Sequence, residues 1–470
     1  MWNGAHVLVV ALSLLAGPYV AAKKYYISVG YLPCIKSEFR YMQGLSISGA
    51  ISMALDEINN STEILPDVTL LLQWADTHCD KLKTTRLFTE MICTWAVAFF
   101  GPEEQCEIPA FIAQSRNLPL ISHKCSDDQI NTSPNFVRMD PAVKKVTKSV
   151  VSLLRYYRWN KFSILYEKAY FKAALSLEHH AKLTKMSLNH LRLVDDSWSQ
   201  IIQDTKSQTR IYVFFGSTPA LVDMMNAMES MQLFARGEYM VIFIDMIPLW
   251  PKDPLDYLLT KDRLVCPKNQ FKKRAQSLMV VVSSPPWSNY ENFARKVHEY
   301  SSMKPFQFPD PFLGNTFFSI HAAYLYDSVK LYATALHNLI EEETVQKNET
   351  LNFNKLMSIA TDGSRIVSKM LALTPFNSIM GSLIRFDEEQ NTEGNYTVLA
   401  YRASSFGDVS MTNFRSDFNC SHSMIPVGRF LERGSSNFPS YAMNLRVPVD
   451  WPGMEKPEDE PACGYSNDKC

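Results

Sequence analysis

Residues 25–74 decide the fold: they open with YYISVGYL at residues 25–32 and close with VTLLLQW at residues 68–74. Both runs are short and almost wholly apolar, as strands buried on two faces are. Between them, apolar side chains recur at helical spacing on one stripe: Ile47, Ile51, Ala54, Leu55 and Ile58. A strand, a helix and a second strand predict a parallel crossover unit, the repeating element of an open α/β sheet.

The same alternation continues along the chain. We expect a helix over residues 80–93, and strands over residues 97–100 and 118–122. A helical stripe ends near residue 157, and a new series of strands begins, at residues 162–166, 211–215 and 239–244. The restart predicts the α/β class with two doubly wound parallel-sheet lobes. The helix between the last two strands carries Met224, Met225 and Met228, which we interpret as core filling rather than a binding surface.

The pattern changes register near residue 279. We expect a strand at residues 279–282, a long helix over residues 317–339, and a hairpin that pairs residues 382–386 with 396–401. After Trp451 the chain is rich in Pro and acidic residues, and we expect no packed structure there.

The change near residue 279 is explained if the chain returns to the first lobe there, so that each lobe is built from discontinuous segments. We place the first lobe at about 23–158 plus about 283–340, and the second at about 159–282 plus about 341–450. Residues 451–470 are expected to form a stalk next to a membrane.

The amino terminus carries a targeting signal. An apolar run at residues 6–20 is followed by Val20-Ala21-Ala22, which predicts a signal peptide over residues 1–22 with cleavage before Lys23. The run is too short to span a bilayer. A buried amino-terminal helix is the alternative. We expect the mature chain to be extracellular, either secreted or at the plasma membrane.

Composition excludes some classes of partner. The chain is 46% hydrophobic and 20% charged, as globular proteins are, and 47 basic residues balance 48 acidic ones. Without a strong net field, neither nucleic acid nor an anionic membrane surface is an expected partner.

The cysteines fit an oxidising compartment. Nine are present, so most should pair and one must lack a partner within the chain. No C-x-x-C spacing or histidine cluster accompanies them, so we expect neither a metal site nor redox catalysis. Four sequons are expected to be glycosylated at the surface, at Asn60, Asn348, Asn395 and Asn419.

Motifs of catalysis are missing from the sequence. It contains no G-x-S-x-G, H-E-x-x-H, G-x-G-x-x-G or P-loop pattern. His179 and His180 are adjacent on a presumed helix and therefore point about 100° apart, which does not suit a shared metal ion. We therefore expect a chain that is not an enzyme and uses no cofactor.

Five segments carry a family resemblance: residues 74–79 (WADTHC), 89–93 (TEMIC), 99–106 (FFGPEEQC), 112–121 (IAQSRNLPLI) and 148–167 (KSVVSLLRYYRWNKFSILYE). In this order they resemble the ectodomain of receptor-type guanylate cyclases, in particular those of invertebrates. The resemblance spans essentially the whole mature chain. It implies the periplasmic-binding-protein type I fold shared with natriuretic peptide receptors, in which two lobes enclose a ligand cleft.

The resemblance also implies disulfides. The family's Cys before the second helix and its Cys after the Phe-Gly-Pro turn correspond to Cys79 and Cys106, and its juxtamembrane loop corresponds to Cys463 and Cys470. A bridge between Cys93 and Cys125 is a separate hypothesis, drawn from their places before the third strand and after the fourth. Cys34, Cys266 and Cys420 remain. The natriuretic receptors bind chloride through a Ser and a Gly-Cys pair, but Gln105 replaces that Gly, which argues against the same site.

Ligands of α/β sheets bind beyond the carboxyl ends of the strands, at the mouth between two lobes. The residues expected there are Tyr31, Gly101, Pro102, Glu103, Glu104, Ser122, His123, Tyr166, Gly216, Ser217 and Asp245. Each has a structural alternative: the Gly-Pro pair turns the chain, Tyr166 ends a buried strand, and Asp245 caps the next segment. Natriuretic-type relatives bind a peptide between two subunits, so the cleft need not be the site.

These observations lead to one principal hypothesis and two others. The principal one is a receptor ectodomain that binds a peptide hormone or neuropeptide, forms a homodimer and, in a full-length receptor, drives cyclic GMP synthesis. A secreted decoy of the same fold is the alternative. A secreted enzyme on a two-lobed scaffold is the third class, and the missing motifs argue against it.

Overall fold

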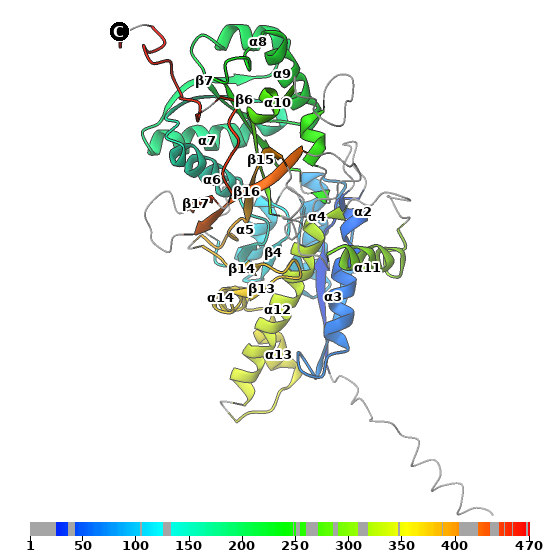
Figure 1. Ribbon diagram of the computed structural model, residues 1–470. Helices are drawn as coiled ribbons and strands as arrows, with labels where there is room; N and C mark the ends of the chain where they lie inside the picture. Colours follow the sequence, from blue (N-terminus) through cyan, green and yellow to red (C-terminus); the bar gives the residue numbers. More distant parts are fainter. Residues whose placement is uncertain are drawn as a thin grey trace, which may run out of the picture.

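Two lobes, each built on its own β-sheet, make up the computed structural model (Figure 1). The described residues are 25–35, 43–103, 106–125, 133–247, 249–250, 254–259, 271–284, 290–308, 318–345, 348–387, 389–403, 422–432, 441–445, 447–453, 455–466 and 469–470. The expected signal peptide and Glu104, Gln105, Cys266, Cys420 and Asn419 lie outside these residues.

The first lobe contains a five-stranded parallel sheet in the order β2-β1-β3-β4-β5. Its strands are β1 (Tyr25–Tyr31), β2 (Val68–Trp74), β3 (Ala96–Phe100), β4 (Leu120–Ser122) and β5 (Phe136–Arg138). The order places β1 between β2 and β3, because the chain winds first to one side of β1 and then to the other.

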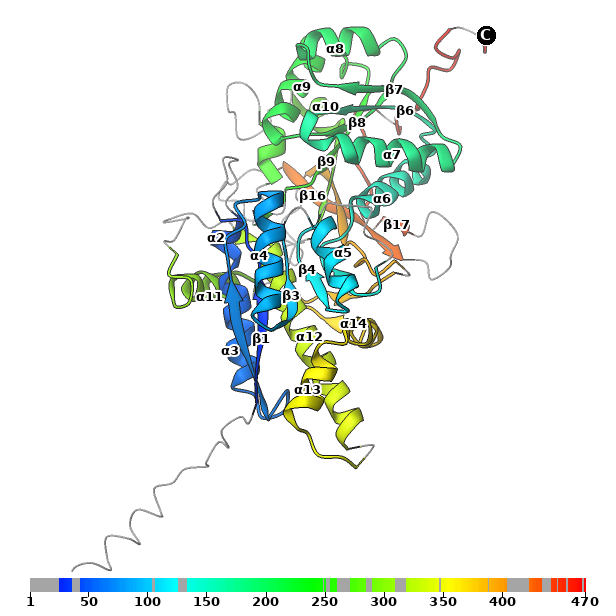
Figure 2. The ribbon, with the colours of Figure 1, turned by 180° about the vertical axis from the view of Figure 1, so that it is seen from behind.

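Helices cover both faces of this sheet (Figure 2). The helices in its sequence range are α2 (Gln43–Ile47), α3 (Gly49–Asn59), α4 (Lys81–Cys93) and α5 (Glu107–Ser115). Ile27, Val29 and Tyr31 of β1 pack toward α3, whereas Phe99 of β3 packs toward α4 and α5. This division into two cores follows the alternation of side chains along each strand.

Later segments of the chain complete the first lobe. They are α11 (Tyr290–Ser302), α12 (His321–Thr344), α13 (Phe353–Ala360) and α14 (Gly363–Ala372). Helices α11 and α12 pack on α3, and α13 and α14 pack on α12. Two short strands, β13 (Phe376–Asn377) and β14 (Leu383–Ile384), follow and pair with each other.

The second lobe contains an eight-stranded sheet in the order β17-β16-β15-β11-β9-β8-β6-β7. Its strands are β6 (Lys161–Tyr166), β7 (Ser187–Leu193), β8 (Ile211–Phe215), β9 (Met240–Asp245), β11 (Leu278–Ser283), β15 (Tyr396–Ala403), β16 (His422–Glu432) and β17 (Tyr441–Leu445). Neighbours from β7 to β11 run parallel, and β15, β16 and β17 extend the sheet antiparallel.

Helices again lie on both faces of the second sheet. They are α6 (Val143–Tyr156), α7 (Phe171–Leu183), α8 (Trp198–Thr205), α9 (Thr218–Ser230) and the short α10 (Lys272–Gln276). The remaining elements are the 3₁₀ turns η2 (Lys168–Tyr170) and η3 (Pro254–Leu258), and the paired strands β10 (Leu249–Trp250) and β12 (Phe318–Ser319). Met224, Met225 and Met228 are buried in the core, which confirms their interpretation as core filling.

The α/β class and the periplasmic-binding-protein type I fold are thus confirmed, with one addition. The three antiparallel strands make the second sheet mixed rather than wholly parallel. The expected hairpin of residues 382–386 with 396–401 is wrong, because β15 pairs with β11 and β16. Val398, Leu399 and Ala400 are buried on both faces of β15, and only a strand inside a covered sheet can bury both.

The expected lobe boundaries also differ from the packing. Helix α6 lies before residue 158 but packs on α7 and β17 of the second lobe. Helices α13 and α14 lie beyond residue 340 but pack on α12 of the first lobe. Gly363 N donates to Asn117 O at 2.6 Å, which fastens α14 to the loop before β4.

Three crossings join the lobes within the described part of the chain: β5 to α6, β11 toward α11, and β14 to β15. The crossings bond to one another. Thr392 Oγ1 donates to Met139 O at 2.7 Å, and Ser284 N donates to Asn395 O at 2.8 Å. Lys145 of α6 forms an ion pair with Asp387 at 2.6 Å. These contacts set the relative placement of the two sheets.

Candidate functional site

Five of the expected ligand contacts meet at the carboxyl edge of the first sheet, where β1, β3 and β4 end. Tyr31 OH lies 3.1 Å from Ser48 Oγ, and the ring centroids of Tyr31 and His123 are 6.0 Å apart. His123 Nε2 lies 3.8 Å from Glu103 Oε1, longer than a hydrogen bond. Ser122 Oγ donates to Pro102 O at 3.3 Å. The adjacency of parallel strands brings these side chains together, as the sequence predicts.

These groups lie inside the lobe rather than on its surface. The exposed fraction is 0% for Tyr31, Ser122 and His123, and 1% for Glu103. Among the described residues, Glu103 Oε1 and both ring nitrogens of His123 have no hydrogen-bond partner. Leaving a buried polar atom without a partner costs about 1–3 kcal/mol, so this cluster lowers the stability of the lobe.

Burial sets the charge state of this cluster. It lowers the pKa of His123 below its usual value, and the nearby Glu103 carboxylate only partly opposes that effect. Burial and the Glu103 charge also raise the pKa of Tyr31 well above its usual range. At neutral pH, His123 and Tyr31 are therefore both neutral.

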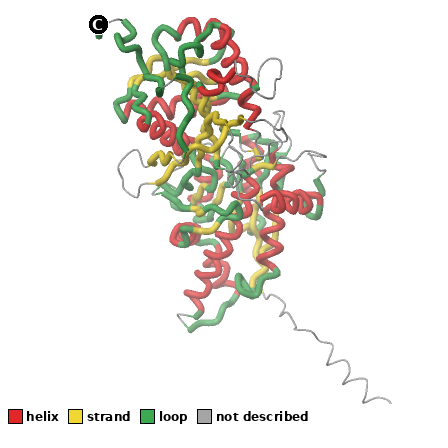
Figure 3. Tube along the Cα trace, in the orientation of Figure 1, coloured by secondary structure: helices red, strands yellow, loops and turns green. Residues whose placement is uncertain are grey.

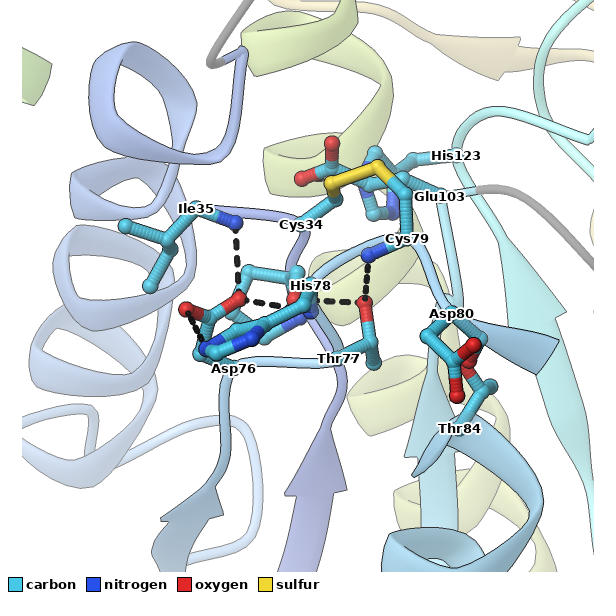
Figure 4. The surroundings of a disulfide bond; sticks show 11 residues. Cys34, Ile35, Asp76, Thr77, His78, Cys79, Asp80, Thr84, Glu103 and His123 are labelled. Carbon is cyan, nitrogen blue, oxygen red and sulfur yellow. Dashed lines mark hydrogen bonds and ion pairs between the residues drawn. A yellow bond between two sulfur atoms is a disulfide. The ribbon is translucent and has the colours of Figure 1, made fainter. Parts of the chain in front are cut away.

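A disulfide fastens the loops that follow β1 and β2. The bridge joins Cys34 to Cys79, with Cα atoms 5.1 Å apart, and Glu103 and His123 belong to its surroundings (Figure 4). The Asp76 carboxylate accepts the backbone N–H groups of Ile35 and His78, each at 2.9 Å. The two loops are therefore held by covalent and polar contacts together.

Hydrogen bonds around Thr77 and Asp80 complete this arrangement (Figure 4). Thr77 Oγ1 donates to Pro33 O at 3.0 Å and accepts from Cys79 N at 3.2 Å. The Asp80 carboxylate accepts from Lys83 N at 2.7 Å and so caps the amino end of α4. The loop after β2 is thus fixed at both ends.

The expected pairing of Cys79 with Cys106 is wrong, and so is the hypothesis for Cys93 and Cys125. Cys106 pairs with Cys125, with Cα atoms 6.2 Å apart, and Cys93 is free and exposed. The order of strands explains the result, because β1 separates β2 from β3, whereas β3 and β4 are neighbours. Two strand spacings, about 9.6 Å, exceed the Cα separation that a disulfide spans. The third bridge joins Cys463 to Cys470, as expected.

The Gly101-Pro102 pair turns the chain, which was the structural alternative to a ligand contact at these two residues. Its peptide bond is cis, and Gly101 has a φ of +88°, a left-handed value that glycine adopts easily. A Cβ atom at this position would lie 3.1 Å from Leu32 O. The turn directs the next residue, Glu103, back into the lobe.

In the second lobe, Tyr166, Gly216 and Ser217 meet at the ends of β6 and β8. Ser217 Oγ caps α9 by accepting from Ala220 N at 3.4 Å. The carboxylate of Glu167 accepts from Ser217 N at 2.5 Å, so it occupies the positive end of the α9 dipole. Sequence reasoning missed Glu167, although it follows Tyr166 directly at the end of a predicted strand.

Asp245 bonds to a separate partner. Its Oδ2 accepts from Tyr257 OH at 2.5 Å, and its Oδ1 accepts from Ile247 N at 3.0 Å. These bonds connect the end of β9 to the following turn, which matches the structural alternative for this residue. The expected contacts therefore fall into a first-lobe cluster, a second-lobe cluster and Asp245.

The described residues contain neither a candidate metal cluster nor a helix that could cross a membrane. No group of three or more His, Cys, Asp or Glu side chains within them is arranged to hold a metal ion. None of their helices combines the length and apolar character needed to cross a membrane. The expected glycosylation sites Asn60, Asn348 and Asn395 are all exposed.

Comparison with known proteins shows the family to which the chain belongs. Residues 46–404 match the family model described as receptor family ligand binding region. The chain is 40% identical to the Drosophila melanogaster receptor-type guanylate cyclase Gyc76C, over 94% of the chain and 30% of that protein. It is 25% identical to guanylate cyclase 32E of the same fly, over 94% of the chain and 36% of the relative.

A third relative is the speract receptor of Strongylocentrotus purpuratus, 24% identical over 91% of the chain and 40% of that receptor. The chain thus spans less than half of the length of each of these relatives. The resemblance is therefore confirmed, and the chain belongs to the family of receptor ligand-binding regions found in receptor-type guanylate cyclases.

Proposed function

We propose that this chain binds a peptide hormone or neuropeptide outside the cell and, in a full-length receptor, couples that binding to cyclic GMP synthesis. Relatives that carry a similar region are named as guanylate cyclases. Two others are named as receptors for speract and for resact. The cyclase activity would belong to a part of the receptor beyond this region.

The burial of the carboxyl-edge residues is the observation that favours a peptide over a small polar ligand. Tyr31, Ser122 and His123 have no exposed surface, and Glu167 already fills the amino end of α9. A free amino acid would have to open the first cluster and compete with a carboxylate in the second. A peptide instead gains affinity from a broad area of accessible surface.

Thermal unfolding of the purified chain tests the ligand class. A bound ligand stabilises the folded state by RT ln(1 + [L]/Kd), so a panel of secreted peptides and a matched panel of free amino acids are compared. We expect at least one peptide, and no amino acid, to raise the melting temperature. Stabilisation by an amino acid alone would overturn the peptide proposal.

Coupling to cyclic GMP is tested with the full-length receptor in cells. A peptide that stabilises the purified region should raise cyclic GMP in cells that express the receptor, and should leave control cells unchanged. A peptide that binds tightly without any change in cyclic GMP would contradict the coupling and leave the binding function intact.

Homodimer formation is a further part of the proposal. It is supported by the resemblance to natriuretic peptide receptors, which bind ligand between two subunits. Light scattering at several protein concentrations, with and without a stabilising peptide, measures the mass. A mass that stays monomeric under every condition would argue against the dimer.

Exposure of the sequons supports an extracellular location. Asn60 and Asn348 lie on the surface of the first lobe, and Asn348 has a left-handed φ of 52°. In protein recovered from cell medium, Asn60→Gln and Asn348→Gln should each remove the mass of one glycan. Protein from the medium that carries no glycan at any sequon would contradict the proposed modification.

A further inference from the structure

The segment after β17 packs against the second lobe, although its composition predicts no packed structure. Trp159, fully buried, donates from its indole Nε1 to Pro457 O at 2.7 Å. The ring of Trp451 lies 5.1 Å from Tyr157 and 6.1 Å from Trp159, measured between centroids. Aromatic packing and a buried hydrogen bond therefore hold a stretch that looks like a stalk in the sequence.

Asp459 bonds to the start of a central strand. Its Oδ2 accepts from the backbone N–H of Asn160 at 2.5 Å and of Lys161 at 2.8 Å. Lys161 is the first residue of β6, which lies between β7 and β8 in the sheet. Hydrogen bonds to a carboxylate are stronger than those between neutral groups. The tail is thus attached to the sheet itself.

Further contacts fix the last residues. Glu460 forms ion pairs with Lys161 and with Lys469. Tyr465, inside the loop that the terminal disulfide closes, donates from its OH to Asp459 O at 2.6 Å, so this loop is held against Asp459. The Cys463–Cys470 bridge closes the end of the chain. The contacts therefore continue from Trp451 to the disulfide.

The attachment lies at the amino edge of the second sheet, opposite the carboxyl edge that holds the candidate ligand contacts. A Cβ atom placed on Gly237, before β9, would lie 2.7 Å from Gly453 N, so the tail also contacts the loop that precedes β9. The chain ends at the outer end of the second lobe, away from the first (Figure 1). Figure 3 shows the segment as loop, so side-chain contacts rather than secondary structure hold it.

We propose that residues 451–470 form a rigid strap between β6 and the end of the region at Cys470. Because the strap is rigid, a movement of the second lobe would move Cys470 with it. The docking of the strap stands on the contacts above. Its use in signalling rests on the proposed function, since a full-length receptor must carry a ligand-induced movement to its cyclase. The strap would then connect the second lobe, and not the first, to the rest of the receptor.

Hydrogen exchange of the whole chain tests the docking without any ligand. Asp459→Ala removes the acceptor of two amides, so exchange at Asn160 and Lys161 should accelerate by about tenfold or more, together with exchange across residues 455–465. Glu458→Ala is the matched control, because the adjacent Glu458 side chain is 70% exposed and pairs with Lys456. It should leave these amides unchanged.

A second variant separates release of the strap from loss of folding. Trp159→Phe keeps an aromatic ring in the core but removes the N–H that bonds to Pro457 O, so the strap should exchange faster while β8 and β9 stay protected. Unprotected strap amides in the unmodified chain, or an Asp459→Ala variant with unchanged protection, would overturn the proposal.

Rigidity is measured by the anisotropy decay of a dye ligated to the carboxyl terminus. In the unmodified chain the dye should rotate with the whole molecule, over tens of nanoseconds, apart from its own linker motion. Asp459→Ala should add a fast component that Glu458→Ala does not. A large fast component already present in the unmodified chain would contradict a rigid strap. None of these readouts depends on the peptide proposal, so the two can fail separately.

Discussion

Asp327 places a carboxyl group in the second turn of α12, buried inside the first lobe. Its Oδ2 accepts from Ser378 Oγ at 2.6 Å and its Oδ1 accepts from Ile379 N at 3.1 Å, so it holds the turn between β13 and β14 against the helix. Burial nevertheless raises the pKa of Asp327 to about 7, because two hydrogen bonds do not replace the lost hydration of the charge.

This pKa makes stability depend on pH. The unfolded chain releases the proton near pH 4 and the folded chain near pH 7, so the folded state binds more protons between these values. The free energy of unfolding should therefore fall as pH rises from 4 to 7, by about 1.4 kcal/mol for each unit of pKa difference. In Asp327→Asn this contribution should vanish, as measured by denaturant unfolding at pH 5 and pH 8.

Ser378→Ala is the companion variant. It retains the carboxyl group but removes a hydrogen bond that lowers its pKa, so the variant should be less stable and its loss of stability should continue to a higher pH. An Asp327→Asn variant whose stability followed the same pH curve as the unmodified chain would show that Asp327 is not the titrating group.

His123 has the opposite effect on how the free energy of unfolding changes with pH. Its pKa is lowered by burial, so below about pH 6.5 the unfolded chain takes up a proton that the folded chain refuses. Stability should consequently decrease as pH falls through this range. His123→Gln should lose less unfolding free energy between pH 7.5 and pH 5 than the unmodified chain does. A His123→Gln variant with the same pH dependence as the unmodified chain would contradict this prediction.

The sequence predicts where these residues lie better than it predicts what they do. Tyr31, Ser122 and His123 come to one edge because parallel strands end together. The alternation of strands and helices in the sequence predicts such a parallel sheet. Helix α12 contacts β3 and β4 from a position about 200 residues after His123. A local pattern predicts that helix but not which strands it covers, so the burial of these side chains could not be predicted. Glu167 was missed because its role exists only when the α9 amino end is placed beside it.

At the scale of elements, the Cys34–Cys79 bridge should contribute measurably to the first lobe. It closes a segment of 45 residues, which predicts a stabilisation of about 2–5 kcal/mol. The double variant Cys34→Ala/Cys79→Ala should lose this amount in guanidinium unfolding, and exchange at the Ile35 amide should accelerate. Cys93→Ala is the control, since that thiol is exposed and free, and should change stability by less than about 0.5 kcal/mol.

Strands with continuous apolar runs were the most predictable elements, including β2 at the edge of the first sheet. Residues 68–74 and 211–215 are strands with the expected bounds, because their apolar runs end sharply. The strand β7 was missed, since it lies at the edge of the sheet and alternates polar with apolar residues only weakly. The hairpin was wrong because residues 383–384 pair with the nearby β13, whereas β15 pairs with β11, a strand far away in the sequence that local turn signals do not reveal.

At the scale of the whole molecule, hydrogen bonds between the crossings set how the lobes sit. Thr392 is buried, and its hydroxyl donates to Met139 O on another crossing. Thr392→Val preserves the shape but leaves that carbonyl unpaired, so we expect a loss of about 1–2 kcal/mol in unfolding free energy. Exchange at Arg138 and Asn391 should also accelerate.

Thr361→Val provides the comparison, since its hydroxyl donates to Met357 O within one lobe. It should cost stability without any effect on the crossing amides. Equal exchange at the crossings in both variants would argue that Thr392 does not control the junction.

The interleaving of the lobes has a consequence for synthesis. The strands of the first sheet are complete at Arg138, but the helices that cover one of its faces extend from Tyr290 to Ala372. The second sheet begins at Lys161 and gains its last strand only at Leu445. Neither lobe can therefore bury its core while the middle of the chain is being synthesised. Each lobe stays partly open until its later segments have left the ribosome. Apolar surface that stays exposed during synthesis favours aggregation, so we expect this interleaved arrangement to make the nascent chain dependent on chaperones.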